Sequence, residues 1–298
     1  MIKKIVDSVG YALSGVSPKL ASHLWYFYCF RKPLNLRSPK TLNEKLMWLK
    51  LNTYRNDPLV TQCADKYRVR EYIEQVGCPE LLNTLYGAWD SAEQIDWDSL
   101  PDAFVLKCNH GCGYNILCAE KSKLDIPGTR QLLDQWMHTD FWRVLAEVQY
   151  QNIPKKIICE AFLGDGNPLL DYKIYCFHGK AEYILVCTER EFGTPKFYFF
   201  NRAWELCPIT RDGKKAGGDF TVERPSRLEE MLEYAERLSA PFPFVRVDFY
   251  YVEGRIVFGE LTFIPSGALD ATRLPETDVM FGEMLELPST ECGARKKT

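Results

Sequence analysis

Two acidic side chains in residues 244–263 form the part of the sequence best suited to chemistry. Alternating apolar and polar residues predict two strands here, joined at Glu253-Gly254-Arg255. A three-residue turn at that point places Asp248 directly opposite Glu260, whereas a two-residue turn would put the two carboxylates on opposite faces. Opposed carboxylates repel each other unless a cation lies between them. Their oxygen atoms suit Mg²⁺, which proteins hold through one or two carboxylates together with substrate phosphates.

The predicted pairing also determines what surrounds these carboxylates. Arg246 lies opposite Thr262, and Tyr250 and Phe258 fall on the face that carries Glu260. The two aromatic residues favour a lined cleft. A solvated polar face, on which the carboxylates meet only Arg246 or water, explains this hairpin equally well when the hairpin is taken alone.

A second candidate site is the loop Lys107-Cys-Asn-His-Gly-Cys-Gly-Tyr-Asn115. Lys107 ends a short apolar strand, and Gly111 and Gly113 follow it. Backbone amides freed by glycine can cradle phosphates, and a lysine adds a point charge. The loop is not a P-loop, and a strand rather than a helix comes next, so a flexible hairpin loop that closes over a triphosphate fits better. A plain tight turn is the alternative.

The same loop and the strand after it offer a zinc interpretation through Cys108, His110, Cys112 and Cys118. The spacing lacks the usual pair of cysteines two residues apart, so zinc is disfavoured. Two other polar residues, Glu160 and Lys173, lie within apolar strands. Their default interpretation is a position on a solvated strand face.

The elements that must position these residues follow an α+β pattern of antiparallel hairpins with helices. Thr41 and Glu44 have the spacing of a capping box at the start of a helix. The turn at 178–180 joins two strands into a hairpin. Helices are predicted over 42–49, 58–76, 128–149 and 226–239, and strands over 103–107, 116–119, 157–163, 170–177, 181–187 and 197–200.

Composition limits the function classes. The 298 residues carry 37 Lys and Arg against 40 Asp and Glu, a net charge of -3, which argues against nucleic acid as a partner. Many of the eleven cysteines fall singly on apparent strands, which indicates reduced thiols and a cytoplasmic location. No apolar run comes close to the length of about 20 residues that a membrane-spanning helix needs. The run Leu24–Phe30, followed by Arg31-Lys32, is compatible with peripheral association at the inner face of the membrane. A helix packed on the protein body is the favoured interpretation.

Taken together, these segments resemble the TupA-like ATP-grasp family of surface-polysaccharide gene clusters. The resemblance rests on five stretches in order along the chain: Ser38-Pro-Lys-Thr-Leu-Asn-Glu-Lys-Leu, Ala64-Asp-Lys-Tyr-Arg-Val-Arg, Phe104-Val-Leu-Lys-Cys-Asn-His-Gly-Cys-Gly, Asp171-Tyr-Lys-Ile-Tyr-Cys-Phe-His-Gly-Lys, and Arg246-Val-Asp-Phe with Gly259-Glu-Leu-Thr-Phe. It implies an ATP-grasp fold in which two α+β subdomains grip the nucleotide. The expected division is a mainly helical N-terminal region 1–100, a nucleotide lid subdomain 101–159 and a catalytic core 160–298 that contains the metal-binding hairpin.

The resemblance also implies roles for individual residues, with ATP and Mg²⁺ as cofactors. Lys107 and Lys173 would contact the nucleotide phosphates, and Glu160 would lie near the adenine and ribose. Asp248 and Glu260 would bind Mg²⁺. The loop residues implied to lie over the phosphates are Asn109, His110, Gly111 and Gly113.

On the substrate side, the resemblance implies that Arg246 holds the substrate carboxylate or the acyl phosphate. Thr262 stands where ATP-grasp sites often carry an asparagine, which argues against a third protein ligand to the metal. A threonine there can still bind a phosphate or a coordinated water. Ser266, Gly267 and Arg273 are further candidates for the acceptor side.

The function implied is ATP-dependent ligation of a carboxylate to an amine through an acyl phosphate. The substrates would be small or glycan-linked, and the product an amide on a cell-surface polysaccharide or its precursor. Three alternatives stay open. A glycosyltransferase could use the triplet Asp96-Trp97-Asp98, which matches the DxD pattern that binds metal and sugar nucleotide. A kinase of the same fold could pass phosphate to a hydroxyl, and a non-catalytic module could bind nucleotide without turnover.

Overall fold

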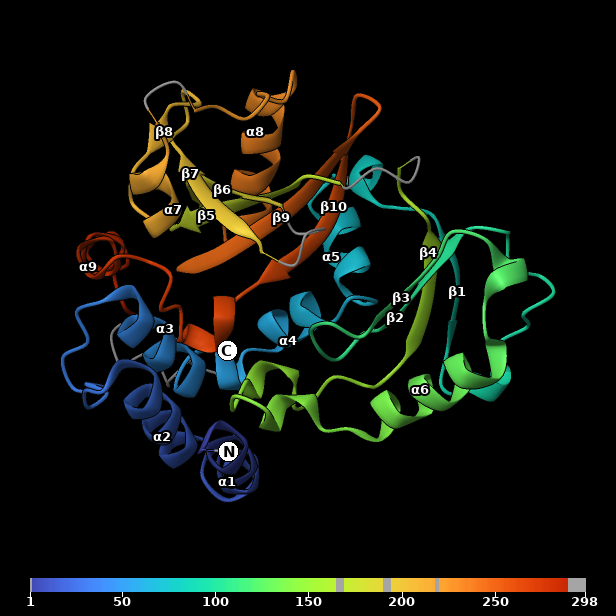
Figure 1. Cartoon of the computed structure of the whole chain (residues 1–298), viewed down its shortest axis with the longest axis horizontal. Coiled ribbons are helices and arrows are strands. Elements are labelled where there is room, and N and C mark those ends of the chain that lie inside the picture. The colour runs from blue at the N-terminus through green and yellow to red at the C-terminus, as the bar shows by residue number, and fades with distance from the viewer. Residues whose placement is uncertain (1, 165–168, 190–193, 218–219, 289–298) are drawn as a thin grey trace, which may run out of the picture.

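The computed structural model describes residues 2–164, 169–189, 194–217 and 220–288. These residues form two antiparallel sheets with helices around them, which confirms the predicted α+β class (Figure 1). The small sheet has the order β1-β4-β2-β3, and the large sheet the order β10-β9-β5-β6-β7-β8. The strands are β1 Leu85–Trp89, β2 Phe104–Cys108, β3 Asn115–Cys118, β4 Ile157–Ala161, β5 Asp171–Phe177, β6 Lys180–Thr188, β7 Lys196–Phe200, β8 Leu206–Cys207, β9 Phe244–Val252 and β10 Arg255–Thr262.

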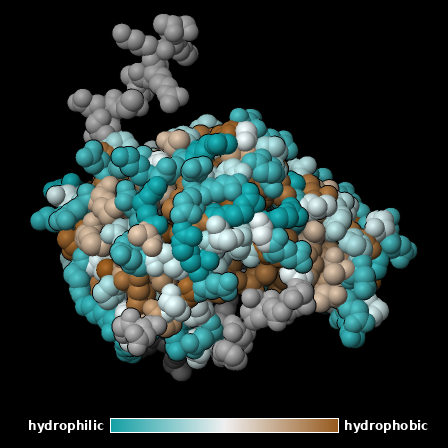
Figure 2. Space-filling view, turned by 90° about the horizontal axis from the view of Figure 1, so that it is seen from above, coloured by the Kyte–Doolittle hydropathy of each residue, from teal (hydrophilic) through white to brown (hydrophobic). Residues whose placement is uncertain are grey.

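The helices surround these sheets and supply most of the remaining core. α8 lies against β5, β6 and β9, α3 packs on α9, and α6 lies along the small sheet (Figure 1). Seen from above, the molecule presents a mainly hydrophilic surface with hydrophobic residues between (Figure 2). The helices are α1 Ile2–Val16, α2 Pro18–Phe30, α3 Leu42–Leu51, α4 Pro58–Ala64, α5 Val69–Gln75, α6 Ile126–His138, α7 Arg211–Lys215, α8 Leu228–Ser239 and α9 Pro275–Glu283.

The two sheets have separate hydrophobic cores. The core of the large sheet also takes in apolar side chains from α3, α4 and α5, while the small sheet packs against α6. β1 was not among the predicted strands, and it pairs with β4 at the edge of the small sheet. The small sheet therefore extends to both sides of the predicted segment 101–159.

Local sequence signals predicted the start of α3 correctly, but they did not predict the break between α4 and α5. The capping box at the start of α3 is present, with the Thr41 side chain accepting from the Glu44 backbone and Glu44 accepting from the Thr41 backbone. The single helix predicted over 58–76 is wrong, because the chain breaks between α4 and α5. The Asp65 carboxylate accepts hydrogen bonds from the backbone of Tyr67 and Arg68 at 2.8 and 3.3 Å. This local turn competes with the helix.

The helix predicted over 128–149 is also shorter than expected. It ends at His138, and short 3-10 turns at Phe141–Arg143 and Val148–Tyr150 follow. The hairpin predicted from the turn at 178–180 is confirmed as β5 and β6, with positive φ angles at His178 and Gly179. The described cysteines are all free thiols, and those on β4, β5 and β6 are buried as predicted.

The hairpin of β9 and β10 reaches the predicted pairing by a different route. Its turn has two residues, Glu253 and Gly254, with φ angles of 50° and 75°, so the three-residue turn is wrong. A bulge between Phe258 and Glu260 then shifts the register by one residue. Asp248 consequently pairs with Glu260, and Arg246 pairs with Thr262, as predicted.

Because of the bulge, Phe258 lies on the opposite face of β10 from the predicted one. Phe258 pairs with Phe249 and joins the hydrophobic core, whereas the prediction placed it beside Glu260. A two-residue turn alone would have separated the two carboxylates, since a shift of one residue exchanges the faces of a strand. The bulge at Gly259 therefore allows Phe258 to lie in the core while Glu260 and Thr262, later in the same strand, pair with Asp248 and Arg246.

Replacing Gly259 with alanine is expected to lower the free energy of unfolding by about 1–3 kcal/mol. An added Cβ would lie 3.0 Å from the backbone oxygen of Asp248 and 3.3 Å from the ring of Tyr250. Urea denaturation measures the change. Gly217→Ala is the control, because a Cβ there meets nothing within 4 Å among the described residues. Equal losses in the two variants would contradict a special role for the bulge.

Candidate active site

A cluster of charged side chains covers one face of β5, β9 and β10. Lys173 and Asp248 are register partners on β5 and β9, and Asp248 pairs in turn with Glu260 on β10. The Lys173 Nζ lies 2.7 Å from Asp248 Oδ2 and 2.5 Å from Asp171 Oδ2. Three adjacent strands thus bring together residues that are far apart in the sequence.

Arg246 connects the cluster from within. Its guanidinium donates to Asp248 in a bidentate manner, with Nε 2.7 Å from Oδ1 and Nη2 2.6 Å from Oδ2. The same Nη2 lies 3.1 Å from the hydroxyl of Thr262 and 3.5 Å from Glu260 Oε1. Thr262 in turn donates to Glu260 at 2.8 Å. The predicted residues Arg246, Lys173, Asp248, Glu260 and Thr262 therefore form one network.

The two carboxylates of this network differ in exposure. Only 3% of the Asp248 side chain is exposed, against 31% for Glu260. Burial raises the pKa of Asp248, while Arg246 and Lys173 lower it. Burial also opposes ionisation of Glu260, but the charges of Lys66, Arg246 and Lys173 outweigh it and lower the pKa of Glu260 to about 2. Glu260 is thus an ionised, partly accessible carboxylate at physiological pH.

This donor set fits a magnesium ion shared with phosphates. Glu260 Oε2 lies 3.8 Å from the Lys66 Nζ, and 31% of the Glu260 side chain is exposed, so this carboxylate is accessible to an ion. Asp248 carries a second hard-oxygen group on the adjacent strand, but both its oxygens accept from Arg246 or Lys173, so it would bind the metal only after these cations turn to the phosphates. Within the described residues no group of three or more His, Cys, Asp or Glu could hold a metal by itself. A two-carboxylate site of this kind leaves the remaining ligands to phosphates and water.

A second cluster lies between the two sheets. Lys107 Nζ on β2 is 2.6 Å from Glu160 Oε2 on β4, and Arg70 Nη1 on α5 is 3.4 Å from Glu160 Oε1. Together with Phe258 and Gly259 of β10, these residues line a pocket of about 10 Å³. That volume holds about one water molecule. The Lys107–Glu160 pair therefore leaves little free volume between the sheets at this point.

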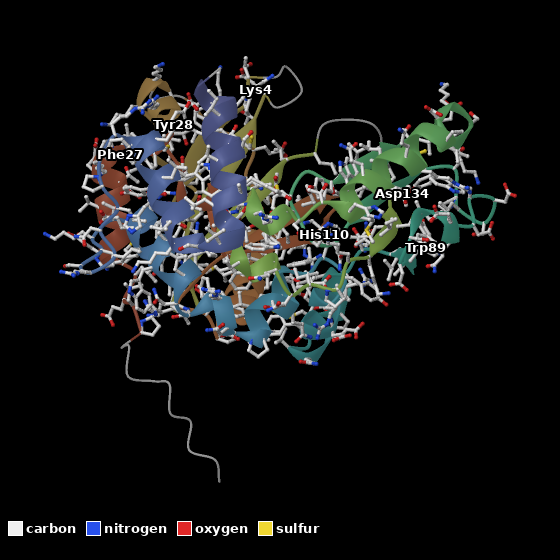
Figure 3. All side chains as sticks on the ribbon, turned by 90° about the horizontal axis from the view of Figure 1, so that it is seen from below. Lys4, Phe27, Tyr28, Trp89, His110 and Asp134 are labelled. Atoms are coloured by element: carbon white, nitrogen blue, oxygen red, sulfur yellow. The ribbon has the colours of Figure 1, made fainter. Side chains whose placement is uncertain are left out.

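The loop between β2 and β3 is anchored by its first residues. The Asn109 amide donates to Asp65 at 2.7 Å and to the Pro154 backbone at 2.9 Å, and Asn109 is fully buried. His110 lies beside α6, with Nε2 3.1 Å from the Trp136 carbonyl oxygen (Figure 3). These two buried side chains hold the loop in place. Their implied place over the nucleotide phosphates stays a prediction.

The glycines of this loop have different environments. A Cβ at Gly111 would lie 2.6 Å from the ring of Phe141, so the loop approaches that ring closely. Gly113 has a φ of +78°, a left-handed conformation that favours glycine. Gly113 and its neighbour Cys112 form the exposed tip. Their backbone amides remain the part of the loop suited to phosphate.

Lys66 is a site residue that the sequence analysis did not assign. Its Nζ lies 2.5 Å from the Gly111 carbonyl oxygen and 3.8 Å from Glu260 Oε2, so it connects the loop to the charged cluster. The break between α4 and α5 positions it there. The stretch Ala64-Asp-Lys-Tyr-Arg-Val-Arg contained the signal, because an Asp whose side chain caps a turn interrupts a helix, and Lys66 follows it.

Replacing Lys66 with alanine is expected to weaken ATP binding and turnover by about tenfold or more, since one charge-assisted contact contributes about 1.5–3 kcal/mol. Removing this cation also takes away the first of the charges that hold the pKa of Glu260 down. Isothermal calorimetry with ATP and magnesium measures the binding. Lys215→Ala, at an exposed position on α7, is the matched control. Unchanged affinity in Lys66→Ala would contradict a role in the site.

The residues suggested for the acceptor side are not equivalent. Arg273 is buried, and its guanidinium lies 2.8 Å from Asp278 and 3.0 Å from Asp270, so its charge is already paired. Ser266 and Gly267 both have positive φ angles, 53° and 63°, in a short turn after β10. Arg273 is therefore a structural residue in this arrangement.

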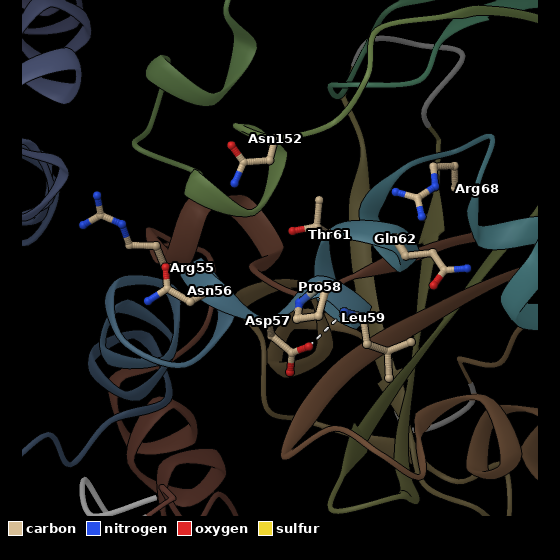
Figure 4. A pocket seen from close by; sticks show the side chains of 9 residues that line it. All are labelled: Arg55, Asn56, Asp57, Pro58, Leu59, Thr61, Gln62, Arg68 and Asn152. Carbon is tan, nitrogen blue, oxygen red and sulfur yellow. Dashed lines mark hydrogen bonds between the residues drawn. The ribbon is translucent and has the colours of Figure 1, made fainter. Parts of the chain in front are cut away.

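The residues behind the glycosyltransferase alternative and the zinc interpretation are not members of the charged network of the large sheet. Asp96 and Asp98 are exposed on either side of the buried Trp97, and the Asp96 backbone accepts from Ser99. Among the described residues, the cysteines and histidine of the zinc interpretation form no metal-binding group. A separate pocket of about 550 Å³ at the start of α4 contains none of the predicted site residues (Figure 4).

Comparisons with solved structures found chains of low sequence identity. D-alanine–D-alanine ligase from Bacillus anthracis, complexed with ATP, is 14% identical over 74% of this chain and 61% of that chain, with a TM-score of 0.46. The Helicobacter pylori D-alanine–D-alanine ligase is 14% identical over 77% and 60%, with a TM-score of 0.43. N5-carboxyaminoimidazole synthetase from Staphylococcus aureus is 11% identical over 77% and 53%, with a TM-score of 0.43. The chain spans about three fifths of the length of the first of these structures.

A match to a protein family covers more of the chain than these structures do. No curated protein matches the chain in sequence. The TupA-like ATP-grasp family matches residues 44–286 of the 298. This segment contains both sheets and all the predicted site residues. Because the match covers most of the chain, the protein has the ATP-grasp fold and belongs to the TupA-like ATP-grasp family.

Proposed function

We propose that this protein is an ATP-dependent ligase that joins a carboxylate to an amine through an acyl phosphate. The observation that carries the proposal is the charged network of the large sheet. Its cations, Lys173 and Arg246, lie beside the paired carboxylates Asp248 and Glu260, and Lys66 connects them to the glycine loop. Such an arrangement would neutralise the phosphates of a nucleotide, with Glu260 as one ligand for magnesium and Asp248 as a second once its cations contact the phosphates.

ATP binding requires a local rearrangement. Lys107 now pairs with Glu160, and their pocket has too little volume for a nucleotide. We propose that the nucleotide phosphates take Lys107 from Glu160, which leaves the carboxylate free for the sugar or base. Asp248 and Glu260 would hold Mg²⁺, which supplies charge neutralisation at the phosphates when it is bound.

The proposed reaction has two steps. A carboxylate oxygen attacks the γ-phosphorus, the bond to the β-phosphate oxygen breaks, and ADP leaves. An amine nitrogen then attacks the acyl carbon, phosphate leaves, and the nitrogen loses a proton to solvent. Arg246 and Lys173 would stabilise the negative charge on the transferred group, so catalysis rests on positioning and electrostatics.

For substrates we propose a uronic acid or related carboxylate of a surface polysaccharide or its precursor, and an amino compound as acceptor. The support is the family, together with a site that needs no protein nucleophile. We also propose a cytoplasmic location, because ATP is available there. Among the described residues, no helix is long and apolar enough to cross a membrane.

Hydroxylamine tests the reaction without knowledge of the amine. The protein, ATP and MgCl₂ are incubated with a panel of uronic and amino acids, and hydroxylamine intercepts any acyl phosphate as a hydroxamate. We expect ADP and hydroxamate in equal amounts with the correct acid. ADP accompanied by a phosphorylated alcohol would identify a kinase instead. Consumption of a UDP-sugar with no use of ATP would identify a glycosyltransferase.

A further inference from the structure

The hairpin of α1 and α2 lies outside the segment that matches the family, which begins at residue 44. One side of this hairpin packs on the rest of the molecule. Leu13, Ala21 and Trp25 contact Leu145 and Ala146 in a small hydrophobic cluster. The fold therefore explains the apolar residues on the inner side of the hairpin and leaves those on the outer side to be explained.

The outer side of the hairpin is also apolar. Ile5, Val9 and Val16 recur at helical spacing on α1, and Leu20 and Phe27 lie two turns apart on α2. Their exposure ranges from 51% to 85%. They make up half of the large hydrophobic residues that are exposed among the described residues, although the hairpin ends at residue 30. Such concentration marks an interaction surface.

Cations flank the apolar side chains. The exposed basic residues of the hairpin and its end are Lys3, Lys4, Lys19, Arg31 and Lys32, and Asp7 is the acidic residue among them. Figure 3 shows Lys4 at the start of α1, at the same end of the hairpin as Phe27 and Tyr28. This end is cationic although the whole chain has a net charge of -3. Positive charge next to exposed apolar side chains is the pattern of an interfacial helix.

We propose that the outer face of the α1–α2 hairpin docks on a membrane surface that contains anionic lipids. Ile5, Val9 and Phe27 enter the boundary between headgroups and acyl chains, while the lysines contact the anionic headgroups. A second copy of the chain is a poorer partner, because self-association through this face would bring two sets of cations together. The inference goes beyond the proposed ligase activity and does not depend on it.

Vesicle co-sedimentation of the full-length protein tests the proposal. The vesicles contain phosphatidylcholine with an increasing fraction of phosphatidylglycerol. We expect binding to rise with the anionic fraction and to fall with salt. In the double variant Val9→Glu/Phe27→Glu, we expect at least a tenfold loss of vesicle binding. Lys3→Gln and Lys4→Gln should each reduce binding to anionic vesicles by about fivefold, the contribution of one lysine near such a surface.

Val279→Glu is the matched control, because Val279 is an exposed apolar residue on α9, and it should retain binding. Thermal melting of each variant confirms that the fold is kept, since all substituted side chains are exposed. The proposal is overturned if the protein ignores anionic vesicles, or if the double variant binds as well as the wild type. A dimer in light scattering that the double variant abolishes would also overturn it, in favour of an interface between copies.

Discussion

Glu260→Gln is expected to reduce ATP-dependent turnover by about 100-fold or more. Glutamine keeps the size of the side chain and can still accept from Thr262, but it lacks the charge that would help to hold magnesium. Loss of metal-assisted charge stabilisation costs several kcal/mol in the transition state, and about 1.4 kcal/mol corresponds to a factor of ten in rate. Steady-state release of ADP measures the effect.

A matched control lies in the same hairpin. Glu253 is an exposed glutamate in the turn between β9 and β10, so Glu253→Gln should leave turnover unchanged. Calorimetry at increasing MgCl₂ separates a weakened metal site from a weakened nucleotide site. Full activity in Glu260→Gln would remove this carboxylate from the reaction and, with it, the proposed role of the paired strands.

The same substitution makes a prediction about pH. The pKa of Glu260 is lowered to about 2 in the folded protein, from an ordinary value of 4.5. An acid with a lowered pKa stabilises the fold above its unfolded pKa, and this contribution is lost as the pH falls through the folded pKa. The wild type should therefore be more stable than Glu260→Gln at pH 6. The difference should narrow as the pH falls below 4.5.

Lys173→Met is expected to lower both stability and turnover. Its ammonium lies between Asp171 and Asp248 and is almost completely buried. Removing it takes one cation from Asp171 and one from Asp248, which keeps Arg246, and breaking a buried pair costs about 3–5 kcal/mol. The pKa of Lys173 is raised, because Asp248 and Asp171 outweigh the opposing effect of burial, so the cation is present at physiological pH.

A double variant distinguishes stability from catalysis at this position. Asp171→Asn/Lys173→Met removes one of the two carboxylates that lose the Lys173 cation, so we expect it to regain part of the free energy of unfolding and none of the turnover. Lys180→Met is the control, because Lys180 is an exposed lysine at the start of β6. Turnover that returned together with stability would show that Lys173 has only a structural role.

The sequence alone predicted those features that depend on neighbouring residues. Thr41 and Glu44 lie in one turn of chain, so their capping box could be recognised from spacing, and the structure contains it. Alternation along β9 and β10 predicted the strands and the pairing of Asp248 with Glu260. The antiparallel α+β class followed from short turns between such strands. In each case, a pattern of neighbouring residues is compatible with few local structures.

Tertiary structure decided the rest of the site. The two-residue turn between β9 and β10 shifts the register by one residue, and the bulge at Gly259 shifts it back. A three-residue turn without a bulge gives the same pairing of Asp248 with Glu260, so the alternation of side chains does not distinguish the two. Lys66 approaches Glu260 only because Asp65 ends α4 and anchors Asn109, a contact between distant parts of the chain. The resemblance implied that Asn109 and His110 lie over the phosphates, and packing against the residues before β4 and against α6 buries their side chains. Spacing along a chain predicts which residues share a face, whereas contacts between separate elements determine what that face meets.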